Sequence, residues 1–176
     1  MLKKIIALLF LSSPFVTAHA ESNANKSICS EEMKWIIGKP LRIQEYAILN
    51  ASGKIFDKFV EINSQKNVTS EGQLWAYKIL ATGNHMLKEQ PIESPRIKNL
   101  TNGFSDSASQ IIRGEIDFEE FKLQINSLIQ KAEIIDQDLY AEKSTLIEED
   151  RKQVDAVYKC VLASAMYGSL TNAKLN

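Results

Sequence analysis

The two cysteines of this chain, Cys29 and Cys160, constrain its fold more than any other feature of the sequence. They lie near opposite ends of the chain, and with two cysteines only one intramolecular pairing exists. A bond between them would join the first helix to the last, and loop-closure arguments put its contribution at about 4–5 kcal/mol. The alternative is two separate buried thiols that pack as small apolar residues. The choice depends on whether the chain leaves the reducing cytoplasm.

The start of the chain, MLKKIIALLFLSSPFVTAHA, has the three zones of a secretory signal peptide. Lys3 and Lys4 precede an apolar run over residues 5–11, and Ala-His-Ala at 18–20 presents the small residues that a signal peptidase accepts. The run is shorter than the roughly 20 residues of a permanent membrane span, although a short anchor or a buried first helix is the alternative. We therefore expect residues 1–20 to be cleaved, the protein to be periplasmic or secreted without stable membrane insertion, and its cysteines to form one disulfide.

The charge balance argues against two kinds of partner. The whole chain has a formal net charge of -1, and removal of Lys3 and Lys4 makes it more acidic. A chain of this kind presents no basic face for the phosphates of nucleic acid or for anionic lipid. We expect neither nucleic acid nor a membrane surface as a partner.

Apolar residues recur at three- and four-residue steps through most of the remaining sequence, which predicts an all-α fold. Residues 21–27 read as a flexible polar leader, 28–169 as a single helical domain and 170–176 as a tail. Five or six helices with short connectors favour a bundle of antiparallel neighbours, with the N- and C-terminal helices linked by the disulfide. The predicted helices cover residues 31–38, 41–64, 70–89, 96–113, 118 to about 147, and a last helix that ends near 168.

Capping residues set several of these boundaries. Ser30 is a candidate N-cap for the first helix, Ser70 begins a capping-box sequence, and Asp117 is a candidate N-cap followed by glutamates. Gly38 and Gly114 are placed to end helices.

Two stretches leave helix continuity open. Asn-Ala-Ser-Gly at 50–53 either weakens the second helix or breaks it in two, because Asn, Ser and Gly disfavour helix interiors. Glu-Glu-Asp-Arg-Lys at 148–152 is either a solvated turn within one very long helix or a junction between two helices.

Candidates for catalysis are few. His85 would act as a general base with Glu89 as its orienting partner, but a surface histidine with an ordinary i,i+4 ion pair is the favoured interpretation. No motif for a nucleophile, a metal site, covalent haem or a calcium loop is present, so we expect no cofactor and no metal.

A group of carboxylates offers a second route to acid–base chemistry, such as glycoside cleavage. Charged residues at such positions more often form the solvated face of a helix, and we expect the protein not to be an enzyme. The group comprises Glu119, Glu120, Glu133, Asp136, Asp138, Glu142, Glu148, Glu149 and Asp150.

Aromatic residues of the early helices suggest a pocket for an apolar ligand, although an ordinary core is the simpler explanation. The last helix carries Tyr158 and Tyr167 off its apolar stripe, which makes them candidates for a contact surface with a partner. The aromatic set is Trp35, Tyr46, Phe56, Phe59, Trp75 and Tyr77.

Four Asn-x-Ser/Thr sequons occur, at Asn25, Asn50, Asn67 and Asn99. They would matter only in a eukaryotic secretory pathway, whereas the leader looks more bacterial.

The leading functional hypothesis is an exported, non-catalytic helical protein that binds another protein, as an inhibitor, an immunity protein or an accessory component of a secretion or envelope system. The alternative is a carrier of a small apolar ligand within the bundle. A hydrolase that uses His85 or the carboxylates is a weaker third hypothesis.

Overall fold

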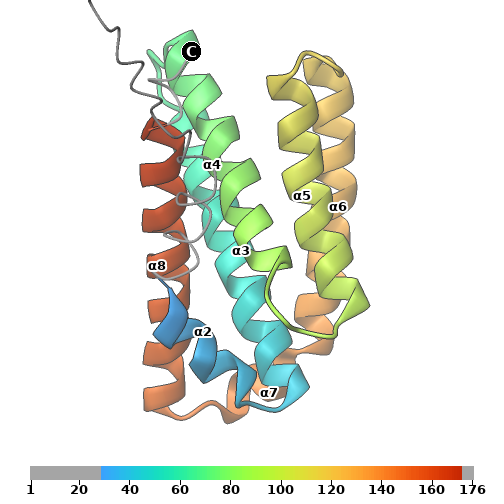
Figure 1. The fold of residues 1–176 in the computed structure, drawn as a ribbon. Coiled ribbons are helices and arrows are strands. Elements are labelled where there is room, and N and C mark those ends of the chain that lie inside the picture. The colour runs from blue at the N-terminus through green and yellow to red at the C-terminus, as the bar shows by residue number, and fades with distance from the viewer. Residues whose placement is uncertain (1–28, 172–176) are drawn as a thin grey trace, which may run out of the picture.

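The computed structural model describes residues 29–171, and this part of the chain is all-helical, as the sequence predicts (Figure 1). The signal peptide predicted at 1–20, the leader at 21–27 and positions 172–176 of the predicted tail lie outside the described residues. The helices are α2 (Ser30–Ile37), α3 (Leu41–Asn63), α4 (Ser70–Lys88), α5 (Pro95–Ile112), α6 (Phe118–Asp138), α7 (Tyr140–Thr145) and α8 (Glu148–Thr171).

A hairpin of α3 and α4 forms the centre of the molecule. Helix α8 packs against both of its helices, and α5 packs along α4 (Figure 1). Helix α6 packs chiefly against α5, so α5 and α6 form a second antiparallel hairpin beside the first. Helix α2 contacts α3 and α8 near one end of the bundle. Antiparallel neighbours with short connectors form one compact body, in agreement with the predicted architecture.

Most of the apolar residues at helical spacing form one buried core, whereas Val60 and Leu74 are exposed. On α8 the stripe Val154, Val157, Val161 and Ala165 is buried, and each of these side chains is at most 4% exposed. Burial of one large aliphatic side chain contributes about 1.5–3 kcal/mol, so the stripes are the main force that assembles the helices. The largest fully buried apolar side chains are Ile36, Ile48, Ile55, Ile79, Leu80, Leu100, Leu139, Val157 and Val161.

Helix α3 is continuous through positions 50–53, where the sequence left a break open. Ala51 and Ser52 are buried, and the Ser52 hydroxyl donates a hydrogen bond of 2.6 Å to Oδ1 of Asn84 on α4. The Asn84 amide in turn donates to the backbone oxygen of Leu80 at 3.0 Å. Tertiary packing and this buried polar pair therefore outweigh the weak local propensity.

Two predicted N-caps are wrong by one residue. Helix α2 has Cys29 as its N-cap, without a side-chain cap, and Ser30 is already helical. At α4 the N-cap is Thr69, whose Oγ1 accepts a hydrogen bond of 3.1 Å from the backbone N–H of Gly72. An N-cap residue needs non-helical backbone angles, and Thr69 has them whereas Ser70 lies in the first turn.

The boundaries between α5 and α6 are as predicted. Asp117 caps α6 by accepting a hydrogen bond of 2.8 Å from the backbone N–H of Glu120. Gly114 has a φ of 69°, a left-handed conformation that ends the preceding helix and that glycine adopts without strain.

The helix predicted to continue to about residue 147 ends at Asp138 instead. A guanidinium N–H of Arg42 binds the Asp138 backbone oxygen at 2.6 Å, and Leu139 is fully buried. The short α7 follows, and Leu146 is extended before α8 begins at Glu148. A junction therefore precedes residues 148–152. The separate α7 raises the count to seven helices in residues 29–171, above the predicted five or six.

A disulfide joins Cys29 to Cys160, as the sequence predicts. The two Cα atoms are 5.8 Å apart although 131 positions separate them in the chain. The bond ties the residue before α2 to the middle of α8 and so closes the chain around both hairpins. None of the helices within residues 29–171 has the length and apolar run needed to cross a membrane.

Candidate functional site

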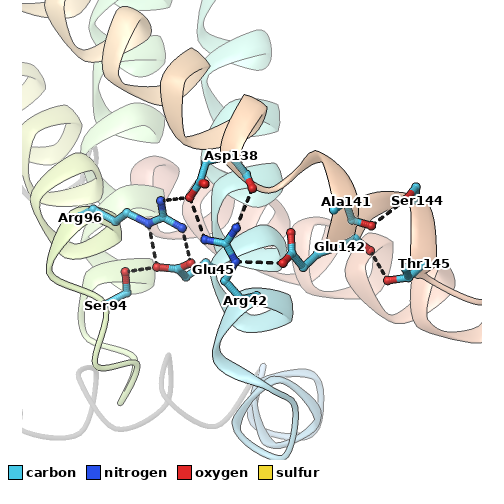
Figure 2. A network of polar contacts seen from close by, with 9 residues as sticks. All are labelled: Arg42, Glu45, Ser94, Arg96, Asp138, Ala141, Glu142, Ser144 and Thr145. Atoms are coloured by element: carbon cyan, nitrogen blue, oxygen red, sulfur yellow. Dashed lines mark hydrogen bonds and ion pairs between the residues drawn. The ribbon is translucent and has the colours of Figure 1, made fainter.

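Charged side chains at one end of the bundle form a polar network that we call the clasp (Figure 2). It connects α3, α5, α6 and α7. Its members are Arg42, Glu45, Ser94, Arg96, Asp138 and Glu142.

Glu45 is the buried member of the clasp, only 5% exposed. Its carboxylate accepts hydrogen bonds from the Ser94 hydroxyl at 2.6 Å and from Nε and Nη2 of Arg96 at 2.9 and 2.5 Å. The hydrogen bonds from Arg96 lower the pKa of Glu45 and outweigh the opposite effect of its burial. The buried charge is thus paired on both oxygens, the arrangement that makes burial tolerable.

Arg42 forms the second half of the clasp. It donates to Oδ2 of Asp138 at 2.7 Å, to the Asp138 backbone oxygen at 2.6 Å and to Oε1 of Glu142 at 3.0 Å. Arg96 also donates to the Asp138 carboxylate, so one aspartate links both arginines (Figure 2). Hydrogen bonds from Arg42 and then Arg96 lower the pKa of Asp138 to about 2.

The clasp holds helices together rather than preparing an acid or a base. A general acid needs a carboxyl with a raised pKa. The carboxylates whose pKa is displaced, Glu45, Glu115, Asp138 and Glu142, are all displaced downward by hydrogen bonds from arginines. The geometry of the clasp therefore favours a structural role.

Further along the bundle, five aromatic rings from four helices form a cluster. The Tyr77 ring of α4 lies edge-on to the Phe121 ring of α6, with centroids 5.1 Å apart. Phe59 of α3 contacts both, at 5.4 Å from Tyr77 and 5.9 Å from Phe121. Phe56 links Phe59 to Phe104 of α5. These contacts join the two hairpins, and such ring pairs contribute about 0.5–1.5 kcal/mol each beyond burial.

Beside this cluster the helices border a pocket of about 650 Å³ that is open to solvent on one side, and we call it the aromatic pocket. Its wall is largely apolar and includes Phe118, which is 57% exposed, and Val60, which is 44% exposed. Pockets of this size and character are the usual sites for small molecules. The lining residues are Phe59, Val60, Asn63, Ser64, Gln73, Tyr77, Ile111, Phe118, Phe121, Lys122 and Ile125.

The structure brings together part of the predicted aromatic set. Phe59 and Tyr77 line the aromatic pocket, and Phe56 lies in the ring cluster behind it. Trp35, Tyr46 and Trp75 pack against the core and do not line this pocket. The sequence did not predict Phe118 or Phe121 as pocket residues. The one local signal is that Phe118 is a large apolar residue in the exposed first turn of α6.

Tyr158 and Tyr167, the predicted contact residues, do not share a surface. They are nine residues apart on α8, about two and a half turns, so they project to opposite sides of the helix. Tyr158 packs against the core, whereas Tyr167 is 66% exposed. Contact with a partner stays a prediction for each.

His85 lies exposed on α4, and no ion pair joins its ring to the Glu89 side chain within the described structure. The predicted carboxylates are dispersed. Asp138 and Glu142 belong to the clasp, Asp150 pairs with Lys39 at 2.7 Å, and Glu119 pairs with Lys122 at 2.7 Å. The others on α6 and α8, Glu120, Glu133, Asp136, Glu148 and Glu149, are exposed.

Among the sequons, Asn67 and Asn99 are exposed, and Asn50 is half-buried within α3. Asn25 lies outside the described residues. Within residues 29–171 no group of three or more His, Cys, Asp or Glu side chains is placed to hold a metal ion.

No protein-family model matches the chain, and no curated protein or solved structure is found to be similar to it. The candidate site is therefore argued from its own geometry.

Proposed function

We propose that the protein binds a small, mostly apolar molecule in the aromatic pocket. The observation that carries the proposal is a pocket of about 650 Å³ to which four helices contribute aromatic or aliphatic walls. Small-molecule sites commonly measure about 300–1,000 Å³ and combine apolar walls with a few polar groups. The proposed role is that of a non-catalytic carrier, because the clasp carboxylates are ionised and occupied by arginines.

The compartment belongs to the same proposal. A leader with the zones of a signal peptide and a disulfide across the whole domain both support a periplasmic or secreted protein. A carrier outside the cytoplasm would move apolar molecules through water.

A neutral fluorescent probe tests the proposal. N-phenyl-1-naphthylamine becomes bright in apolar surroundings, and we expect saturable binding at one site per chain. The variant Val60→Trp places a larger side chain at the partly exposed wall of the pocket and should weaken binding at least tenfold. Leu123→Trp is the matched control, because Leu123 is 69% exposed and does not line the pocket. Equal binding by wild type and Val60→Trp, with both folded by circular dichroism, contradicts the proposal.

A second candidate is the binding of another protein, as an inhibitor, an immunity protein or an accessory component of a secretion or envelope system. The observation that favours it is on α6, where Leu123 and Ile134 are 69% and 66% exposed. They are eleven residues apart, about three turns, and so lie on the same side of the helix. Exposed apolar side chains on one face are typical of contact surfaces.

Crosslinking in the native envelope or secreted fraction separates this candidate from the first. We expect one partner to crosslink to the wild type and to be lost with the double variant Leu123→Ser and Ile134→Ser. Failure to recover a partner at native expression, or recovery by both proteins alike, counts against it.

A further inference from the structure

The polar residues of the aromatic pocket are gathered at one end. Asn63 and Ser64 end α3, and Gln73 lies in the first turn of the antiparallel α4. Lys122 lies near the start of α6, at the same end of the bundle. Phe59 lies about a turn deeper along α3. These side chains define a polar end of the pocket, which the apolar Phe118 and Ile111 also border, and the lining deeper along the bundle is aromatic and aliphatic.

The polar end of the pocket carries a positively charged side chain. Lys122 is the single charged side chain that lines the pocket among the described residues. Its ammonium is 2.7 Å from Oε2 of Glu119 and 5.8 Å from the centroid of the Phe118 ring. The Lys122–Glu119 pair is exposed, with side chains 50% and 71% accessible, and exposed pairs of this kind are weak and readily exchanged. Glu119 does not line the pocket, so the charge that the described lining contributes is the ammonium of Lys122, and a bound anion would compete with Glu119 for it.

The wall of the pocket also contains the hydroxyl group of Tyr77. The Tyr77 hydroxyl makes no hydrogen bond to any other group in residues 29–171. Burial raises the pKa of Tyr77, so the hydroxyl keeps its proton and can donate to a bound acceptor.

We propose that the ligand is an anionic amphiphile, whose tail packs on Phe59, Phe121 and Ile125 and whose headgroup lies at Lys122. This inference rests on the proposed function and adds the chemical class of the molecule. Charge complementarity at the polar end selects the sign of the headgroup, and the aromatic interior selects an apolar tail.

Calorimetry with three probes that share an eleven-carbon alkyl tail tests the class: dodecanoate, undecanol and undecyltrimethylammonium, each below the concentration at which it aggregates. We expect dodecanoate to bind about fivefold more tightly than undecanol, as for an exposed charge pair, and undecyltrimethylammonium most weakly. Decanoate should bind about 15-fold more weakly than dodecanoate, since each buried methylene adds about fourfold.

Variants of Lys122 test whether the headgroup of the ligand binds at this residue. Lys122→Gln should abolish the preference for dodecanoate over undecanol, and Lys122→Glu should reverse the order of the two charged probes. Lys131→Gln is the matched control, because Lys131 is an exposed lysine of α6 outside the pocket. Equal affinity for the three probes, or a preference that survives Lys122→Gln, overturns the inference. Binding of the neutral naphthylamine without any binding of dodecanoate also overturns it, while the proposed function stands. Failure of all apolar probes defeats both.

Discussion

The clasp and the aromatic pocket hold the same two hairpins together in different ways. In the clasp, two arginines and three carboxylates make short, directed hydrogen bonds, and the buried Glu45 has both oxygens paired. Around the pocket, ring contacts between 5.1 and 5.9 Å join Phe59, Tyr77 and Phe121, and beside them a space of about 650 Å³ is left. One end of the α5–α6 hairpin is held by hydrogen bonds between charged groups, and the other is held by ring contacts.

This difference teaches how a small bundle combines stability with a binding site. Hydrogen bonds to charged groups fix position, because they weaken steeply with distance and angle. Ring pairs also have preferred geometries, but each contributes only about 0.5–1.5 kcal/mol beyond burial, so the ring cluster resists displacement less than hydrogen bonds between charged groups. We therefore expect damage to the clasp to lower global stability and damage to the pocket to lower affinity.

The largest expected loss of stability comes from the disulfide, which lies in neither the clasp nor the aromatic pocket. The double variant Cys29→Ser and Cys160→Ser removes the disulfide without leaving a lone thiol, and it should lower the free energy of unfolding by about 4 kcal/mol, because a very long loop is released in the unfolded chain. Urea unfolding measures this change. At low temperature the folded variant should still bind the naphthylamine as wild type does. An unchanged unfolding midpoint in oxidised protein would contradict the prediction, and lost binding in a folded variant would show that the disulfide shapes the pocket.

Arg96→Ala should have the next largest effect, about 3 kcal/mol, since it leaves Glu45 buried without its main partner. Urea unfolding again provides the measurement. Arg113→Ala is the control: Arg113 binds Glu115 at 2.6 Å, but both side chains are at least 50% exposed, and we expect a much smaller loss than in Arg96→Ala. Similar losses in the two variants would remove the distinction between the clasp and an ordinary surface pair.

The contrast between the two regions also explains what the sequence could predict. The stripe on α8 and the cap at Asp117 depend on spacing within a few turns, and both are found. The clasp was not predicted because Arg42 and Asp138 are 96 positions apart, and in the sequence each resembles a solvated helix residue. No helix pattern shows that Glu45 is buried.

The pocket was predicted only in part for a related reason. Phe59 and Tyr77 were recognised as candidates because aromatic residues are dense in the early helices. Whether such rings fill a core or border a space depends on the separation between α3 and α6, which neither helix's periodicity encodes. The cap at Thr69 shows the same limit on a smaller scale, since Ser70 is an equally good capping residue by type.

Phe121→Leu probes the ring cluster directly. Leucine keeps an apolar side chain but loses the edge contact with Tyr77 and the contact with Phe59, so we expect a loss of about 1.5 kcal/mol in unfolding free energy. The naphthylamine affinity should fall at the same time. A loss as large as that of Arg96→Ala would mean that the ring cluster, rather than the clasp, fixes the hairpin.

Acid should weaken the clasp selectively. The pKa values of Glu45, Asp138 and Glu142 are lowered in the folded protein, so the unfolded chain takes up protons first as the pH falls. The clasp carboxylates stabilise the folded protein fully at pH values above the ordinary carboxyl pKa. This stabilisation is lost as the pH falls from about 4.5 towards about 2, where Asp138 itself titrates. Thermal melts across this range should show a smaller slope in Arg96→Ala than in wild type. Identical slopes would contradict a role for the clasp in acid stability.

Phe118→Ala should have the smallest effect on stability and the clearest effect on affinity. Phe118 is 57% exposed at the wall of the pocket, so its removal should change the unfolding free energy by no more than about 0.5 kcal/mol. A bound probe would lose one aromatic contact, and its affinity should fall about tenfold. Tyr140→Ala is the matched control, because Tyr140 is a 70% exposed aromatic side chain that does not line this pocket. If both variants bind the naphthylamine equally well, Phe118 is an ordinary surface residue, and the division of labour between a stabilising clasp and a binding end loses its support.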